Sequence, residues 1–172
     1  MKTIKILALV ILLTSAKSFA QSSSIKWMTI TEAEAAMKKE PKKIITDIYT
    51  DWCGWCKRLD ATTYKDPKVV DYINKNFYAV KFNAETHDDI IFKGTTYSYD
   101  ASYRVNGLSR VLMGNSTGYP TTTFMDGNME ILSVVPGYIQ PEMMLNILKY
   151  FGDDIYKTKD WNTYLNSVSP QD

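Results

Sequence analysis

Apolar residues in this chain fall into short runs that alternate between strand and helix periodicity, with proline, glycine and acidic residues between them. The β-branched and aromatic run from Lys43 to Thr50 predicts a buried strand, and Phe77 to Phe82 predicts another. Between them, Asp66-Pro67 has the form of an N-cap followed by proline at the first helical position, which predicts a helix to about Asn76.

The pattern before the first strand is less regular. Ile25 to Ile30 alternates loosely, as an edge strand does. Thr31-Glu32-Ala33-Glu34 has the form of a capping box, which predicts a helix from there to about Lys39, ended by Pro41. We therefore expect one strand and one helix ahead of the buried strand.

The second half of the chain continues the alternation. It predicts, in order, a small hairpin over 90–97 turning at Lys93-Gly94, a short helix before Gly114, strands over 121–125 and 131–135 joined by Asp126-Gly127-Asn128, a helix opening at Pro141 and a further helix over 153–168. Strands alternating with helices, followed by an antiparallel pair, predict an α/β fold with a mixed central sheet covered by helices on both faces.

The first residues follow a different pattern. Two lysines precede an apolar run from Ile6 to Leu13, and small residues flank Phe19 before the expected cut at Ala20. This pattern is typical of a secretory signal peptide, and the run is far shorter than the ~20 apolar residues of a membrane-spanning helix. We expect residues 1–20 to be removed, leaving a soluble, exported single domain over 21–172.

Charge excludes one class of function. The 172 residues carry 20 basic and 19 acidic side chains, a formal net charge of +1. Removal of residues 1–20 takes away three lysines and no acid, so the mature charge is 1 − 3 = −2. Because no basic stripe accompanies this balance, the sequence gives no indication of nucleic-acid binding.

The chain has only two cysteines, placed together as Cys53-Gly54-Trp55-Cys56. A bridge between such close neighbours closes a tiny loop and adds little stability, so reactivity explains the pair better than an inert structural disulfide. A metal site is the other alternative, but zinc takes four ligands and His87 is the only histidine. Lys57 after Cys56 also removes the haem-attachment pattern. We expect no metal and no cofactor beyond the two cysteines.

The position of the pair predicts two different roles. A helix is expected to begin with Cys53, where unsatisfied backbone amides and the helix dipole favour a thiolate and lower the pKa from about 8.5 to between about 3.5 and 7.5. We expect an exposed Cys53 to attack a substrate disulfide and a shielded Cys56 to resolve the mixed disulfide. The flat aromatic side chains of Trp52 and Trp55 would form an apolar surface to which the substrate binds.

The segment from Trp52 to Lys57, after a buried strand, resembles the active-site motif of the thioredoxin family. The resemblance covers about residues 43–150 and implies a thioredoxin-like fold. It implies that Asp47, six residues before Cys53, is a buried proton shuttle and that Lys81 is its partner. Desolvation of a buried carboxyl group would raise its pKa and suit it to that role.

The same resemblance implies a substrate groove. Tyr119 and Pro120 fall in the family's loop whose cis-proline faces the cysteines, and Gly137 falls where the family has a glycine beside the groove. Trp55 departs from the proline usual at its position, and Tyr119 from a smaller aliphatic residue. Both departures can move the redox potential and the choice of substrate.

A longer segment over 83–117, with Tyr97, Tyr99 and Tyr103, and an extra C-terminal helix are further departures. They resemble thioredoxin-like proteins exported by some Gram-negative bacteria, which implies a periplasmic or otherwise exported protein. Hairpin packing is favoured over a binding face for the three tyrosines.

Two functions remain in view. The favoured one is an enzyme that exchanges disulfides with exported proteins, as a reductase or isomerase; for a reductase the resemblance implies a membrane electron donor. The alternative is a partner-binding module that uses the tyrosine-rich insertion and for which redox cycling is incidental. Binding retained by a variant with both Cys53 and Cys56 changed to serine would favour the module.

Overall fold

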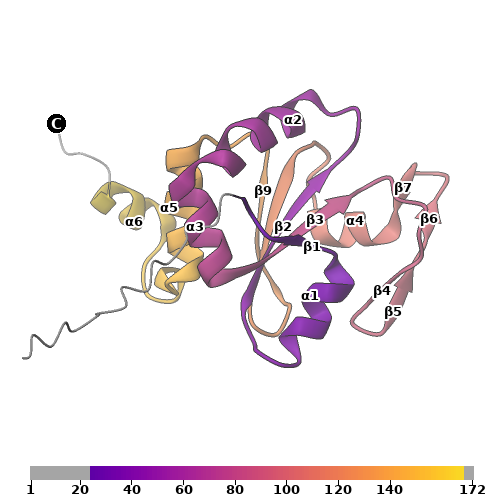
Figure 1. The fold of residues 1–172 in the computed structure, drawn as a ribbon, viewed down its shortest axis with the longest axis horizontal. Coiled ribbons are helices and arrows are strands. Elements are labelled where there is room, and N and C mark those ends of the chain that lie inside the picture. Colours follow the sequence, from indigo (N-terminus) through magenta and orange to yellow (C-terminus); the bar gives the residue numbers. More distant parts are fainter. Residues whose placement is uncertain (1–23, 169–172) are drawn as a thin grey trace, which may run out of the picture.

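The computed structural model describes residues 24–168, which form a five-stranded mixed sheet with helices on both faces (Figure 1). The strand order is β1-β3-β2-β8-β9, with bounds β1 (Trp27–Met28), β3 (Phe77–Asn83), β2 (Lys43–Tyr49), β8 (Thr121–Met125) and β9 (Ile131–Pro136). Strands β1 and β2 run parallel to β3, whereas β8 is antiparallel to β2 and β9 to β8. The predicted mixed α/β sheet is confirmed.

The expected signal peptide, residues 1–20, lies outside the described residues. Over 24–168, none of the helices combines the length and the apolar character needed to cross a membrane.

Alternation along β2 builds two cores. Ile45 faces the cluster that includes helices α3 (Pro67–Asn76) and α5 (Pro141–Gly152), whereas Ile44 and Ile48 face the cluster that includes α1 (Ile30–Met37) and α4 (Gly107–Met113). Because successive strand side chains point to opposite faces, a strand covered on both faces is apolar nearly throughout. Only Thr46 and Asp47 interrupt the buried stretch of β2, and Asp47 is the residue expected to have a chemical role.

Helix α1 begins earlier than predicted. Its capping box is formed by Thr29 and Glu32, with the Thr29 N–H donating to Glu32 Oε2 at 2.7 Å and the Glu32 N–H donating to Thr29 Oγ1 at 3.1 Å. The prediction of a box at Thr31 and Glu34 was therefore wrong. A start at Ile30 places Ile30, Ala33 and Met37 on one buried face, and that burial selects between the two overlapping motifs.

The segment over 83–117 lies on the right in Figure 1 and packs against the face of the sheet that α1 covers; we call it the 83–117 lobe. It contains the hairpin of β4 (Ile90–Phe92) and β5 (Thr95–Tyr97), the small pair of β6 (Tyr99–Asp100) and β7 (Val105–Asn106), and α4. Lys93 and Gly94 at the hairpin turn both have positive φ (50° and 76°), as a tight two-residue turn requires.

The three tyrosines of this lobe have different surroundings. Tyr97 packs against the core beside α1 and α4, and Tyr99 stacks on His87 with ring centroids 3.7 Å apart. Tyr103 is exposed and carries the Arg110 guanidinium 3.8 Å from its ring centre. Two of the three therefore serve packing.

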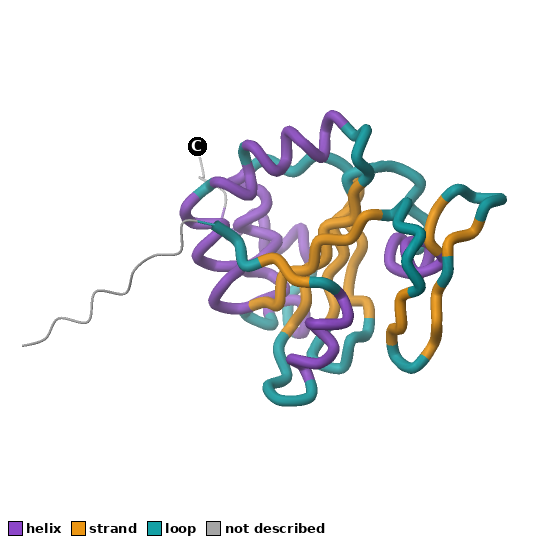
Figure 2. Tube along the Cα trace, turned by 45° about the vertical axis from the view of Figure 1, so that its right-hand side comes forward, coloured by secondary structure: helices purple, strands orange, loops and turns teal. Residues whose placement is uncertain are grey.

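The C-terminal segment is a short 3-10 turn, η2 (Ile155–Lys157), followed by α6 (Trp161–Val168), where one helix over 153–168 was predicted. The left-handed Asp154, with φ 60°, separates η2 from α5, and the chain leaves the helical conformation again after Lys157. Asp160 then accepts from the Thr163 N–H at 3.0 Å and starts α6. Figure 2 shows these helices at the end of the sheet opposite the 83–117 lobe.

Candidate active site

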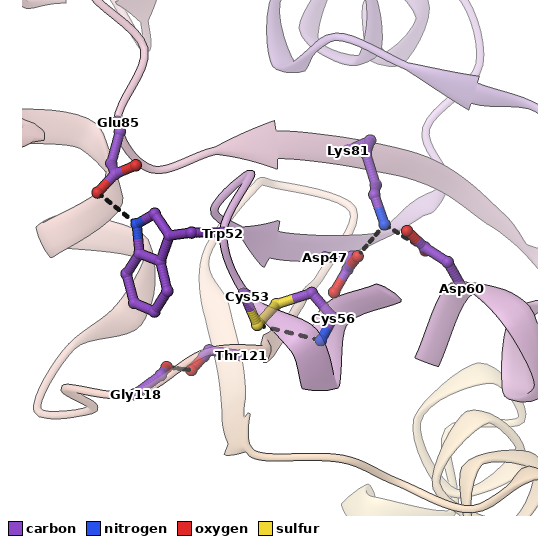
Figure 3. The surroundings of a disulfide bond; sticks show 9 residues. All are labelled: Asp47, Trp52, Cys53, Cys56, Asp60, Lys81, Glu85, Gly118 and Thr121. Carbon is purple, nitrogen blue, oxygen red and sulfur yellow. Dashed lines mark hydrogen bonds and ion pairs between the residues drawn. A yellow bond between two sulfur atoms is a disulfide. The ribbon is translucent and has the colours of Figure 1, made fainter. Parts of the chain in front are cut away.

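The two cysteines lie where β2 ends and α2 (Gly54–Ala61) begins (Figure 3). They form a disulfide, with an S–S distance of 2.10 Å. Cys53 is the N-cap of α2 and not its first helical residue, and its Sγ accepts from the Cys56 N–H at 3.0 Å. The Cys53 sulfur thus accepts a hydrogen bond from a backbone amide of the first turn of α2.

The expectation of an exposed Cys53 was wrong for this disulfide form. Cys53 is only 4% exposed and Cys56 only 2%. The neighbouring aromatic residues take the exposed positions instead, Trp52 at 67% and Trp55 at 56%. Large side chains on both sides of a short cysteine leave little of it open to solvent.

Asp47 and Lys81 are brought together by strand register. They are direct partners in the parallel β2–β3 pair, and Lys81 Nζ donates to Asp47 Oδ2 at 2.5 Å. Lys81 also donates to Asp60 of α2, which the sequence interpretation did not identify. Asp60 follows Cys56 by four residues, and this spacing on one helix face was the available signal.

The electrostatics of this cluster depend on burial. Asp47 is completely buried, and desolvation raises its pKa to about 6, against the opposing effect of Lys81. Burial also disfavours the Lys81 ammonium, but Asp47 and Asp60 outweigh this, and the pKa of Lys81 is raised. Asp47 Oδ1 is buried without a hydrogen-bond partner, so the group has one free oxygen. We call Asp47, Lys81 and Asp60 the carboxylate floor.

Aromatic rings surround the Lys81 ammonium on its other sides. The Trp27, Tyr49 and Tyr64 ring centres lie 5.2, 5.0 and 5.5 Å from Nζ. Such contacts favour the charged amine, and therefore the ionised form of Asp47 beside it.

The Trp52 side of the disulfide is held by two other segments. The Trp52 indole N–H donates to Glu85 Oε1 at 2.9 Å, and the indole ring meets Tyr119 edge-on at 6.0 Å. Glu85 lies at the start of the 83–117 lobe, and Figure 3 shows it reaching the indole. The lobe therefore positions Trp52.

The loop expected to face the cysteines has the implied conformation. The Tyr119–Pro120 peptide is cis, and the Gly137 N–H donates to the Pro120 carbonyl at 2.7 Å. Thr121 Oγ1 donates to the Gly118 carbonyl at 2.7 Å, beside the disulfide in Figure 3. Gly137 has φ 89°, a conformation that favours glycine. Pro120 and Gly137 are therefore neighbours.

The Trp55 side is held by α2 and by the residue after Gly137. Trp55 contacts Tyr138 with ring centroids 5.6 Å apart, and the Arg58 guanidinium lies 5.3 and 5.4 Å from the two ring centres. Thr62 and Tyr138 hydroxyls hydrogen-bond at 3.0 Å. The sequence interpretation identified neither Arg58 nor Tyr138. We call Trp52, Trp55, Tyr119 and Tyr138 the aromatic rim.

Over residues 24–168, no three histidine, cysteine or acidic side chains gather in a way that could hold a metal ion. What the site combines is a two-cysteine pair at a helix N-terminus and a buried carboxyl group whose pKa lies near neutrality. Thiol–disulfide exchange needs these two parts, a sulfur nucleophile and a proton acceptor.

Known proteins are similar to part of this sequence. The thiol:disulfide interchange protein DsbD of Pectobacterium atrosepticum is 32% identical over 62 residues, 36% of this chain and 10% of that protein. A protein disulfide-isomerase of Schizosaccharomyces pombe is 41% identical over 51 residues, 30% of this chain and 14% of that protein. The chain therefore matches only a small part of these relatives.

Solved structures agree on the fold. A thioredoxin-fold protein from Helicobacter pylori superposes with a TM-score of 0.57 at 17% identity, covering 86% of each chain. A putative disulphide-isomerase from Bacteroides thetaiotaomicron gives 0.55 at 24% identity, covering 82% of this chain and 100% of that one. The family model described as a thioredoxin-like domain matches residues 30–152, from α1 to the end of α5. With its cysteine pair at the start of α2, the chain belongs to the thioredoxin-like domain family.

Proposed function

We propose that the protein is a thiol:disulfide oxidoreductase that acts as a reductase or isomerase. The observation that carries the proposal is the Cys53–Cys56 disulfide at the N-terminus of α2, beside a buried Asp47 whose pKa is raised to about 6. Relatives named as a thiol:disulfide interchange protein and a protein disulfide-isomerase support the same reaction class.

In the reducing direction, the Cys53 thiolate attacks one sulfur of a substrate disulfide. A Cys53–substrate disulfide forms, and the second substrate sulfur leaves as a thiolate that takes up a proton. Cys56 then gives its proton to Asp47 and attacks Cys53 Sγ, which expels the remaining substrate thiolate and forms the Cys53–Cys56 disulfide. Two electrons pass from the protein to the substrate.

The carboxylate floor supplies the proton acceptor. Figure 3 shows Asp47 on the Cys56 side of the disulfide, with Lys81 beyond it. A pKa of about 6 leaves Asp47 ionised and able to accept a proton near neutral pH. Lys81 links Asp47 to Asp60, whose side chain is 45% exposed, so Asp60 connects the buried carboxyl group with solvent.

The aromatic rim and the cis-proline loop supply the substrate surface. Trp52, Trp55 and Tyr119 contact apolar side chains beside the substrate disulfide. Pro120 has no N–H, which leaves the neighbouring backbone free to pair with an extended substrate, and Gly137 lies beside that groove.

The proposed substrates are disulfides of exported proteins, and a membrane electron donor would return a reductase to its dithiol form. The N-terminal pattern supports export. In a Gram-negative host, the periplasmic protein should begin at Gln21 when its N-terminus is sequenced. Full-length chain recovered from the cytosol alone would contradict this part of the proposal.

The test of the reaction class is the reduction potential of the pair in the mature protein, titrated against glutathione or dithiothreitol. A potential of about −270 mV indicates a reductant and one of about −120 mV an oxidant, while values between them leave an isomerase open. A pair that does not cycle overturns the oxidoreductase proposal.

One observation favours the partner-binding alternative. The 83–117 lobe exposes large apolar side chains, Ile91 and Tyr103. Retained partner binding by the Cys53→Ser, Cys56→Ser double variant would support it.

A further inference from the structure

An apolar groove of about 1010 Å³ runs along one side of α5. Its walls come from β9, α5 and α6, including Leu132 and Val135 from β9, Met143 and Ile147 from α5, and Trp161 and Leu165 from α6. Helix α6 is held in place by Tyr150, which contacts the Trp161 ring at 5.1 Å and donates through its hydroxyl to the Lys159 carbonyl at 2.8 Å. The contacts of Tyr150 therefore hold the α6 wall of the groove in position.

One end of this groove meets the candidate active site. Tyr138 lines the groove and also contacts Trp55, the residue between Gly54 and Cys56. Arg58 stacks on both rings and fixes them relative to each other. A polypeptide bound at the aromatic rim can thus continue past Tyr138 into the groove without leaving an apolar surface.

We infer that this groove binds an extended apolar segment of the same polypeptide whose disulfide the protein exchanges. The inference rests on the proposed function and specifies its substrate class. Such a segment is available in an unfolded or misfolded protein, because apolar side chains near a cysteine are buried once that protein has folded.

The chemistry of the groove favours a polypeptide. In the described part of the sheet, β9 is an edge strand, so its outward N–H and C=O groups can pair with an added extended strand while the groove takes alternate side chains. Among the described lining residues, Glu142 carries the only charge. Segments with a lysine or arginine among apolar residues should therefore bind better than acidic ones.

The test compares two peptide disulfides, a short one and one extended by an apolar segment through spacers of increasing length. At the best spacer length the mature protein should reduce the extended peptide with a kcat/KM about tenfold higher, because burial of one large apolar side chain corresponds to at least that factor. Met143→Asp places a charge on the exposed part of the groove wall and should bring the ratio close to one. Val111→Asp is the matched control, because Val111 is on α4, away from the groove, with 43% exposure against 39% for Met143. It should keep the wild-type ratio.

Each other outcome has a defined meaning. A ratio near one in the wild type, or a loss shared by Val111→Asp, overturns the groove inference. If neither peptide is reduced, the proposed function has failed, and the groove is then judged by fluorescence anisotropy of a labelled, cysteine-free apolar peptide. Binding that Met143→Asp abolishes supports the inference, and absence of binding overturns it.

Two other occupants are also tested. The first occupant is a second copy of this chain. If sedimentation detects dimers of the wild type but only monomers of Met143→Asp, the groove is assigned to that second copy. The second occupant is the apolar run over 6–13. If the mature protein binds the peptide but the chain that retains residues 1–20 does not, the groove is assigned to that run. Either result overturns the substrate assignment.

Discussion

The aromatic rim and the carboxylate floor lie on two sides of the same disulfide and are opposite in character. Trp52 and Trp55 on the rim are more than half exposed, whereas Asp47 on the floor is completely buried. The rim is held by contacts between rings and by hydrogen bonds to Glu85 and Thr62, and the floor by ion pairs to Lys81. Under the proposed function we expect a division of labour, in which the rim selects substrates and the floor handles the proton.

Removal of the Cys56 sulfur, the proposed resolving group, should have the largest effect, because the proposed reaction then stops whatever the aromatic rim and the carboxylate floor contribute. Cys56→Ser should lower turnover by about a thousandfold or more, as loss of a catalytic nucleophile does. The mixed disulfide between Cys53 and the substrate should then accumulate and be visible by mass spectrometry. Cys53→Ser, the matched control, should give no adduct. An adduct through Cys56 would reverse the assigned roles.

Asp47→Asn tests the floor alone and should slow resolution of the mixed disulfide by about a hundredfold near neutral pH, the usual contribution of a general base. Preference between apolar and polar substrate peptides should not change. A changed preference with an unchanged rate would contradict the division of labour.

The same variant has a thermodynamic signature. Because burial raises the pKa of Asp47 from 3.8 to about 6, the folded state binds the proton more tightly than the unfolded state, and the free energy of unfolding falls as pH rises from about 4 to about 6. The shift corresponds to about 3 kcal/mol above pH 6, an upper limit for what Asp47→Asn can regain. Denaturant unfolding at several pH values should show the variant more stable at pH 8 and flatter between pH 4 and 6. Equal pH dependence in both proteins would show that Asp47 ionises normally.

Two further floor variants should act in opposite directions and more weakly. Lys81→Met removes the cation that lowers the pKa of Asp47, so that pKa should rise above 6. Asp60→Asn removes a carboxylate that raises it, so the pKa should fall. NMR titration of the Asp47 carboxyl group measures both shifts. Shifts of the same sign would show that Asp60 acts mainly through the position of Lys81.

The smallest effect is expected on the rim. Glu85→Leu removes the acceptor for the Trp52 indole and should raise KM for peptide substrates about threefold, the value of one modest hydrogen bond. Glu85→Gln, which keeps an acceptor, should stay close to wild type, and neither variant should move the pH profile. A shifted profile would mean that the two sides are coupled.

Features set by local sequence pattern or by the family resemblance could be predicted, whereas contacts between residues far apart in the chain could not. The strand and helix order followed from hydrophobic periodicity, and the placing of Lys81 opposite Asp47 followed from the family resemblance, with the parallel β2–β3 register now giving the physical reason. Glu85 and Tyr138 could not be found in this way. Each contacts a tryptophan of the motif across a loop, Glu85 from 33 residues along the chain, and no periodicity encodes such a distance.

Three predictions from the sequence were wrong in detail, each for its own structural reason. Two overlapping threonine–glutamate motifs could each start α1, and only burial of Ile30 decides between them. The start of η2 follows a left-handed Asp154, a conformation that the sequence permits but does not require. Burial of Cys53 depends on the folded surroundings of the disulfide, which no local sequence pattern encodes.

The β2–β3 register has an evolutionary consequence. Asp47 and Lys81 face each other because of a backbone ladder, so a one-residue insertion within either strand would turn one of them to the opposite face. Insertions between the strands, in the segment that carries the cysteines, leave the ladder intact. The proposed proton acceptor would thus be inherited with the sheet, while the residues around the sulfurs are free to diversify. New substrates could then be acquired without rebuilding the chemistry beneath them.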